Sequence, residues 1–275
     1  MLKLPVKKKV YKMVNNNCLN CNEELTGNFC AGCGQKADTH RISFKNFIFH
    51  DLLHGTFHIE KGMLFTAKQA LLRPGQAALD YISGKRKRYY NVFLLVLLIY
   101  GVMLFTRHVD EMFTQTSGEI IPEKVYQNEA SKKMDELISQ KSKIILLLFV
   151  PFAAFNSFVL FRRKKLNISE HFIIAGMVLL GILLLATFAN IFFQFNLIMQ
   201  LNTMVLSMIV TAIIVFYIGN GYVKTFGSDY PKLGITYRIV LFFAFFCIEI
   251  VLLGLVLTGI VTDWKFGAIT IAPFE

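Results

Sequence analysis

Residues 239–260 read IVLFFAFFCIEIVLLGLVLTGI, and Glu249 is the only charged residue among them. Such a stretch forms a helix that rises about 1.5 Å per residue, long enough to cross the roughly 30 Å hydrocarbon core of a bilayer. It lacks the apolar–polar alternation of a barrel strand, so its backbone must satisfy its own hydrogen bonds as a helix. Four more stretches share this character, at residues 92–106, 144–161, 172–193 and 197–218. The sequence therefore predicts an all-α polytopic membrane protein with five transmembrane helices and a connecting turn at residues 194–196.

The distribution of basic residues predicts the orientation of these spans. Fifteen Lys and Arg lie in residues 1–90, four in residues 162–165 and three in residues 220–238. The other seven lie in residues 107–143 and the C-terminal tail, together with nine acidic residues. Because cytoplasmic segments are enriched in Lys and Arg, five spans place the N-terminus in the cytoplasm and the C-terminus outside.

The formal net charge of +11 follows from the same pattern. Basic residues that flank spans meet lipid headgroups, so we expect anionic membrane lipids as their partners and do not expect nucleic acid. The residues that we expect to contact headgroups are Lys85, Arg86, Lys87, Arg88, Arg162, Arg163, Lys164 and Lys165.

Composition divides the chain into four parts. They are a basic N-terminal tail at residues 1–14, a four-cysteine segment at 15–37, an amphipathic juxtamembrane region at 38–90, and the transmembrane domain at 91–275 with an outside loop at 107–143. Within the juxtamembrane region, residues 42–58, 63–72 and 75–82 mix large apolar side chains with basic ones or histidine, the composition of helices that lie on a membrane surface. We therefore expect interfacial amphipathic helices before the first span.

Four cysteines form two Cys-x2-Cys pairs within the string CLNCNEELTGNFCAGCGQK, residues 18–36. Two such pairs can place four thiolates around one tetrahedral zinc ion at about 2.3 Å, which closes the coordination shell. Two disulfides are disfavoured by the reducing cytoplasm, and an iron centre of rubredoxin type would use the same ligands. We expect one structural zinc ion, bound by Cys18, Cys21, Cys30 and Cys33. We expect the fifth cysteine, Cys247, to be a small buried hydrophobe.

Three histidines, His50, His54 and His58, recur four residues apart. On a helix they would stack along one face, which makes them a candidate second metal site. The alternative is that three amphipathic side chains line the boundary between an apolar face and the headgroups. Gly55 weakens the helix that would have to hold a metal, and this favours the alternative.

Glu249 lies near the middle of the last span, where a charge costs at least about 2.5 kcal/mol. No Lys or Arg lies within a span, so we expect a protonated carboxyl that faces the bundle and shares a hydrogen bond with Ser207, Thr211 or Thr187. It either packs as a neutral residue or acts as a functional carboxyl that carries protons or binds a substrate. A polar cluster at the outer ends of the third and fourth spans comprises Asn190, Gln194, Asn196, Gln200 and Asn202.

The order of motifs from the cysteines to the first span resembles an uncharacterised bacterial family, Domain of Unknown Function 3667. The resemblance runs through residues 18–91, and its most specific pieces are FCAGCGQK at 29–36, Arg73-Pro74-Gly75 and Tyr81-Ile82-Ser83-Gly84-Lys85-Arg86. The family is written with a proline where this chain has Val92. The resemblance implies a multi-pass protein of the bacterial inner membrane with a zinc-binding head, and it implies no activity.

The sequence contains no Walker loop, dinucleotide fingerprint, HExxH motif or nucleophile elbow. We therefore predict no catalytic residue and expect a membrane-embedded scaffold or accessory subunit. Its zinc knuckle and surface helices would dock a protein partner, either another protein or further copies of this chain in a homo-oligomer. The alternative is a small transporter or lipid-handling protein that uses Glu249 and the outer polar cluster.

Overall fold

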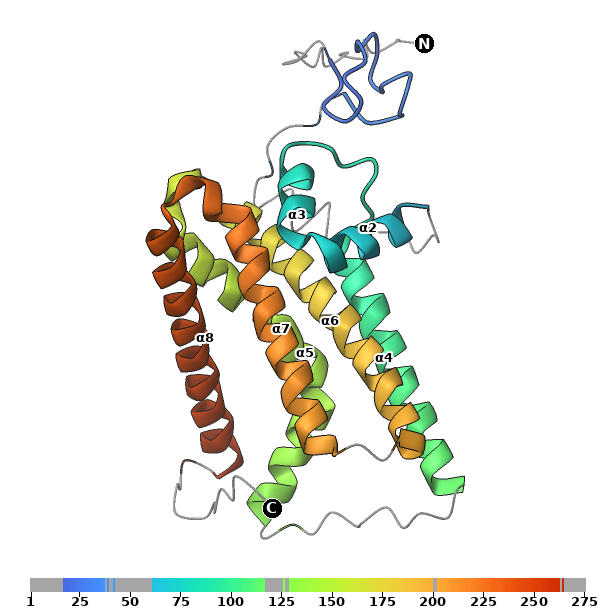
Figure 1. The fold of residues 1–275 in the computed structure, drawn as a ribbon, viewed down its shortest axis with the longest axis vertical. Helices are drawn as coiled ribbons and strands as arrows, with labels where there is room; N and C mark the ends of the chain where they lie inside the picture. Colours follow the sequence, from blue (N-terminus) through green and yellow to red (C-terminus); the bar gives the residue numbers. More distant parts are fainter. Residues whose placement is uncertain are drawn as a thin grey trace, which may run out of the picture.

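The computed structural model describes residues 17–37, 39, 42, 61–116, 126, 129–199, 202–262 and 264, except for the side chains of 61, 110, 111, 113–116 and 194–199. These residues contain seven α-helices and no β-strand (Figure 1). The helices are α2 (Lys61–Leu72), α3 (Pro74–Ile82), α4 (Val92–Thr116), α5 (Glu129–Leu160), α6 (Ile168–Met199), α7 (Thr203–Phe226) and α8 (Lys232–Val261). The last five are long and apolar enough to cross a membrane, and they correspond to the five stretches predicted to be spans.

Helix α6 forms the centre of the bundle and is the most buried of the five long helices. It is apolar on all sides, as expected for a helix surrounded by protein, and it contacts α2, α3, α4, α5 and α7. Ile174, Val178 and Leu180 are fully buried in it. By contrast, α7 and α8 expose most of their apolar side chains, which is appropriate for helices whose outer faces contact lipid.

Helices α2 and α3 occupy two of the stretches predicted to lie on the membrane surface. Ala70, Ala77 and Ala78 are fully buried, and the two helices pack against α6 and α7 at one end of the bundle (Figure 1). The Tyr217 hydroxyl of α7 donates a hydrogen bond to the Ala70 carbonyl. One face of the α2–α3 hairpin is therefore part of the protein core. The third predicted stretch, residues 42–58, lies outside the described residues except for Ile42.

The long helices extend beyond the apolar stretches from which they were predicted. Helix α4 continues to Thr116 and α5 begins at Glu129, so much of the expected outside loop at 107–143 is helical. Helix α6 continues to Met199, so the prediction of a turn at 194–196 is wrong and the fourth span begins at Thr203. Helical hydrogen bonds continue into polar sequence, where hydropathy gives no signal.

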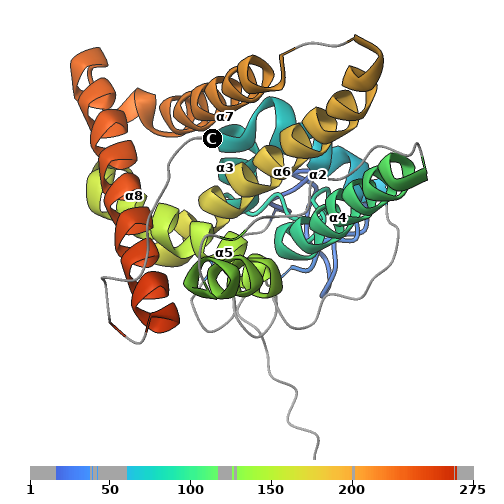
Figure 2. The same ribbon diagram turned by 90° about the horizontal axis from the view of Figure 1, so that it is seen from below.

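Helix α5 contains Pro151, which removes a backbone donor and allows the helix to bend. In Figure 2 the first half of α5 is seen end-on, whereas the second half runs sideways toward α8. The bend brings the second half of α5 between α6 and α8, and it contacts both.

Asparagine side chains define the starts of three long helices. Asn91 accepts hydrogen bonds from the backbone amides of the first turn of α4, and Asn202 does so for α7. At the start of α6, Asn167 and Glu170 form a reciprocal capping box, with bonds of 2.8 and 3.0 Å. This box explains why Glu170 is buried although it is a carboxylate.

Candidate metal centre and its contacts with the membrane domain

The segment of residues 17–37, here called the head, builds the same turn twice. In each copy, the backbone amide of the first cysteine donates a hydrogen bond to the carbonyl of the residue five positions later. The carbonyl of the same cysteine accepts a hydrogen bond from the amide of the residue four positions later. These bonds join Cys18 to Glu23 and Asn22, and Cys30 to Gln35 and Gly34, at 2.8–2.9 Å. Asn22 and Gly34 have φ angles of 65° and 70°, the left-handed conformation that glycine and asparagine tolerate best.

The two turns bring four sulfur atoms together. All four lie within 4.8 Å of one another, and the pairs Cys18–Cys33 and Cys21–Cys30 are separated by 3.5 and 3.4 Å. A disulfide requires about 2.05 Å, whereas ligands at 2.3 Å around a tetrahedral ion are separated by about 3.8 Å. The geometry of the four thiols therefore fits one metal ion, and the predicted ligand set is assembled as expected.

Gln35 fixes the head to residues 84–88, here called the neck. Its side chain is 5% exposed. Its amide group donates to the Gly84 carbonyl at 2.9 Å, and its oxygen accepts from the amides of Arg86 and Lys87 at 3.2 Å each. All three of these hydrogen bonds are made with the neck backbone, so the second turn of the head and the neck are held in one arrangement.

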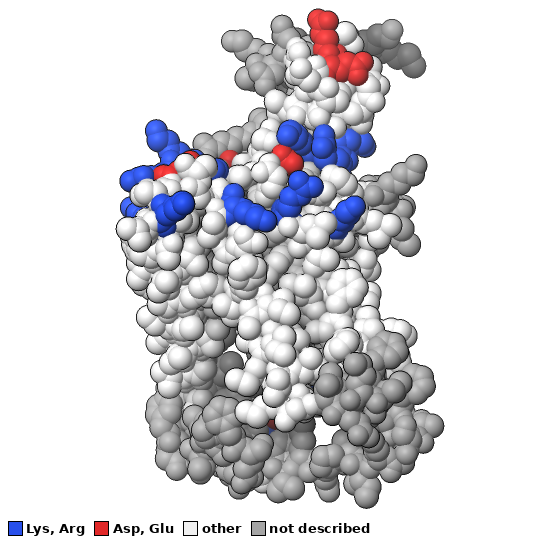
Figure 3. All heavy atoms as spheres, in the orientation of Figure 1, with Lys and Arg blue, Asp and Glu red and all other residues white. Residues whose placement is uncertain are grey.

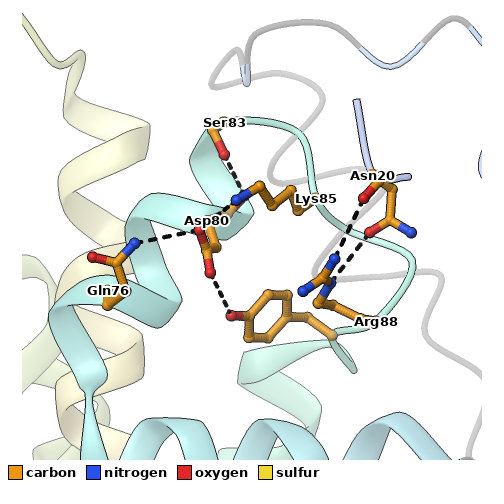
Figure 4. A network of polar contacts seen from close by, with 7 residues as sticks. Asn20, Gln76, Asp80, Ser83, Lys85 and Arg88 are labelled. Carbon is orange, nitrogen blue, oxygen red and sulfur yellow. Dashed lines mark hydrogen bonds and ion pairs between the residues drawn. The ribbon is translucent and has the colours of Figure 1, made fainter. Parts of the chain in front are cut away.

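The first turn of the head also contacts the neck. The Arg88 guanidinium donates to the side-chain oxygen and the carbonyl of Asn20, at 3.4 and 3.3 Å (Figure 4). Gly84 has a φ of 101°, and a Cβ atom there would lie 2.6 Å from the Leu19 side chain. The positive φ therefore favours glycine at this position, and a larger residue would also have to displace the Leu19 side chain.

Asp80 of α3 organises the other side of the neck (Figure 4). Its carboxylate pairs with Lys85 at 3.0 Å and accepts a hydrogen bond from the Tyr89 hydroxyl at 3.3 Å. Burial, together with the nearby Asp80 charge, raises the pKa of Tyr89 to about 12, so the phenol remains a donor. The carboxylate thus ties the end of α3 to the segment that enters the first span.

The basic residues predicted to contact headgroups lie at the head end of the bundle. On the face shown in Figure 3, Lys and Arg form a belt there, below the acidic tip of the head. Several also have protein partners: Lys85 pairs with Asp80, Arg86 lies over the Tyr81 ring, and Lys164 pairs with Asp229 at 3.0 Å. Lys87, Arg88, Arg162, Arg163 and Lys165 are exposed. Contact with headgroups remains a prediction.

Glu249 has a partner that the sequence did not indicate. The side-chain amide of Asn156, which is 2% exposed, donates to the Glu249 carboxyl at 2.8 Å. The three expected partners are wrong, because the hydroxyl groups of Ser207, Thr211 and Thr187 donate to carbonyls of their own helices. Asn156 comes within reach because α5 bends toward α8.

The remaining sequence candidates are not assembled into a site among the described residues. His50, His54 and His58 lie outside the described part of the chain. In the outer polar cluster, Asn202 caps α7 and Asn190 is half-buried on α6. The side chains of Gln194, Asn196 and Gln200 are not described. Cys247 is exposed on α8, so the expectation that it is buried is wrong.

Sequence reasoning missed a second polar cluster, in which three long helices meet. Ser157 of α5 and His171 of α6 are joined by a 2.8 Å hydrogen bond between Oγ and Nδ1, and both are buried. The Tyr222 hydroxyl of α7 is also buried, and it has no hydrogen-bond partner among the described residues. The residues come from different helices without a shared motif, so spacing gave no signal.

A comparison with known protein families gives a match in the segment that includes the neck. A family model described as Protein of unknown function (DUF3667) matches residues 60–101. The predicted resemblance to this family is confirmed. The DUF3667 match covers α2, α3, the neck and the first turns of α4, and it does not include the four cysteines. No curated protein and no solved structure matches the chain.

Proposed function

We propose that the protein is a membrane-anchored docking protein whose head is stabilised by one zinc ion. The observation that carries the proposal is the closed cluster of four thiols, held on the transmembrane domain by Gln35. Four thiolates leave zinc no position for water or a substrate, so the ion stabilises the fold and supplies no chemistry of its own. A head with Leu25 as its main apolar core residue has too little core to fold without such a cross-link.

The surface offered to a partner lies on the tip of the head. Glu23 and Glu24 are exposed there (Figure 3), and Phe29 of the head is 60% exposed. An aromatic side chain on a rigid module can insert into a pocket of a partner with little loss of conformational entropy. The proposed partner therefore has an apolar pocket with a basic rim, and it lies in the cytoplasm of a bacterium at the inner membrane.

Elemental analysis of the purified full-length protein tests the metal assignment. We expect one zinc per chain. Cys18→Ser should lose the ion and unfold the head while the spans remain inserted, because a structural site loses most of its affinity with one ligand. Cys247→Ser is the matched control and should keep the ion. Iron in place of zinc, or no metal after purification without chelator, would overturn the assignment.

Site-specific photo-crosslinking in cells tests docking. A photo-reactive amino acid at Phe29 should give one adduct of discrete mass, whether with another protein or with a second copy of this chain. The adduct should be absent when Cys18→Ser is added. Ser83, exposed at the end of α3, is the control position and should give no such adduct. Equal adducts from both positions, or none from Phe29, would contradict the proposal.

A second candidate function rests on the bond between Asn156 and Glu249. A carboxyl in a span is costly, and ionisable residues within spans commonly mark ion or substrate pathways and proton relays. This candidate is a small transporter or lipid-handling protein in which Glu249 binds the ion or substrate. It predicts that function requires a titratable side chain at position 249, a requirement that docking does not impose.

A further inference from the structure

The connections between α5 and α6 and between α7 and α8 meet at the Tyr230 ring. The Arg163 and Arg238 guanidiniums lie 4.9 and 4.2 Å from the ring centroid. The Tyr230 hydroxyl accepts a hydrogen bond from the Arg163 backbone amide at 3.0 Å. Arg238 also lies 4.5 Å from the centroid of Tyr237, so it is held between two aromatic side chains. Two cations, one from each connection, are thus held against the ring of Tyr230.

Backbone carbonyls orient these two guanidiniums without neutralising them. Arg163 donates to the Asp229 carbonyl at 3.1 Å, and Arg238 donates to the carbonyls of Leu160 and Gly234 at 3.1 and 2.8 Å. The Asp229 carboxylate is occupied by Lys164 at 3.0 Å. Within the described ranges no carboxylate forms an ion pair with either arginine. The pair therefore keeps its positive charge.

An apolar groove on α8 begins beside Arg238. It is lined by Leu233, Thr236, Tyr237, Val240 and Leu241. Leu233 is 86% exposed and Val240 62% exposed, so the groove opens to the surroundings of the bundle. Tyr237 belongs to both features, because its ring contacts Arg238 and lines the groove. The basic pair and the groove are therefore continuous.

We propose that this continuous surface binds one anionic phospholipid. The phosphate lies at Arg163 and Arg238, and one acyl chain follows the groove on α8. Guanidinium groups match the geometry of phosphate oxygens and form two parallel hydrogen bonds with them. The two connections that carry the site lie at the head end of the bundle (Figure 1), where a leaflet rich in anionic lipids supplies the ligand. A soluble phosphate compound has no acyl chain and would leave the groove empty. Occupation of the groove therefore distinguishes a bound phospholipid from a bound soluble phosphate.

Native mass spectrometry of the full-length protein in mild detergent tests the site. With phosphatidylglycerol we expect one lipid retained per chain, and with phosphatidylcholine we expect retention at least about tenfold weaker, because the choline cation reduces the attraction. Glycerol 3-phosphate, the probe without acyl chains, should not displace the lipid. Displacement by glycerol 3-phosphate or equal retention of the two lipids would overturn the proposal.

Two single variants, Arg163→Gln and Val240→Asp, locate the site, and Arg162→Gln is the control. Arg163→Gln should weaken phosphatidylglycerol retention about tenfold or more. Arg162→Gln changes the net charge equally on the next residue, and Arg162 has no ring contact in the described structure, so it should change retention less than threefold. Val240→Asp places a charge in the groove and should also abolish retention if the acyl chain lies there. If the two arginine variants behave alike, or if Val240→Asp binds normally, no specific site exists on this surface. Arg163 and Val240 are exposed, so these variants should fold.

Discussion

In the part of the chain that the structure describes, the buried hydroxyl of Tyr222 has no hydrogen-bond partner. A buried unpaired polar group costs about 1–3 kcal/mol, so Tyr222→Phe should raise the thermal unfolding midpoint in detergent. Tyr217→Phe is the matched control, because it removes the hydroxyl that donates to Ala70, and it should lower the midpoint. Differential scanning fluorimetry checks both variants. A lower midpoint for Tyr222→Phe would mean that the hydroxyl has a partner, for which the Ser157 hydroxyl is the candidate.

Glu249 separates the two candidate functions. Glu249→Gln should leave stability nearly unchanged, because an amide oxygen accepts the Asn156 hydrogen bond as the carboxyl does. Glu249→Leu should destabilise the protein by about 1–3 kcal/mol, because it leaves the buried Asn156 amide unpaired. Thermal unfolding of both variants, beside Asn156→Leu/Glu249→Leu, measures the coupling of the two residues.

Complementation of a deletion strain then gives the functional result. If Glu249 carries protons, the glutamine variant should fold normally and lose function, because an amide does not titrate near neutral pH. A glutamine variant that is stable and fully active would end the proton-carrier hypothesis and leave docking as the function.

At the scale of elements, the contact between α3 and α7 depends on Gly75. A Cβ atom at this position would lie 2.1 Å from the Thr225 hydroxyl and 2.7 Å from the Gly221 carbonyl. Gly75→Ala should therefore displace α3 and cost about 1–3 kcal/mol, as over-packing of a core does. Gly101→Ala is the control, because nothing lies within 4 Å of its Cβ position in α4. Equal thermal midpoints for the two variants would show that α3 does not pack against α7 as described.

The helices themselves were predictable, and their packing was not. Hydropathy located all five spans, because each stretch is apolar along its whole length. The placement of α2 and α3 could not be derived in this way, since an amphipathic helix packs equally well on lipid or on protein. Ala70 and Gly75 indicate the second arrangement only when Tyr217 and Thr225 are known to face them.

At the scale of the whole molecule, the head and both basic connections lie at one end of the bundle, and α8 ends at the other (Figure 1). The positive-inside rule predicts that the head end is cytoplasmic. Reporter fusions after Lys36, within residues 162–165 and near Asp229 should therefore report the cytoplasm. Fusions near Glu123 and after Asp263 should report the outside. A cytoplasmic signal after Asp263 would contradict the arrangement of five spans.

The sequence by itself determined the features that depend on local order: the five apolar helices, the basic end of the bundle and the four-cysteine ligand set. Only the tertiary structure decided which polar groups meet. Asn156 reaches Glu249 because the second half of α5 runs toward α8 (Figure 2), and Arg163 and Arg238 both contact Tyr230 because two connections converge on this ring. Ligand spacing and hydropathy are properties of neighbouring residues, whereas these pairs join residues 75 to 93 positions apart. Which side chains form such a contact depends on how the helices pack, and this packing cannot be derived from a single sequence.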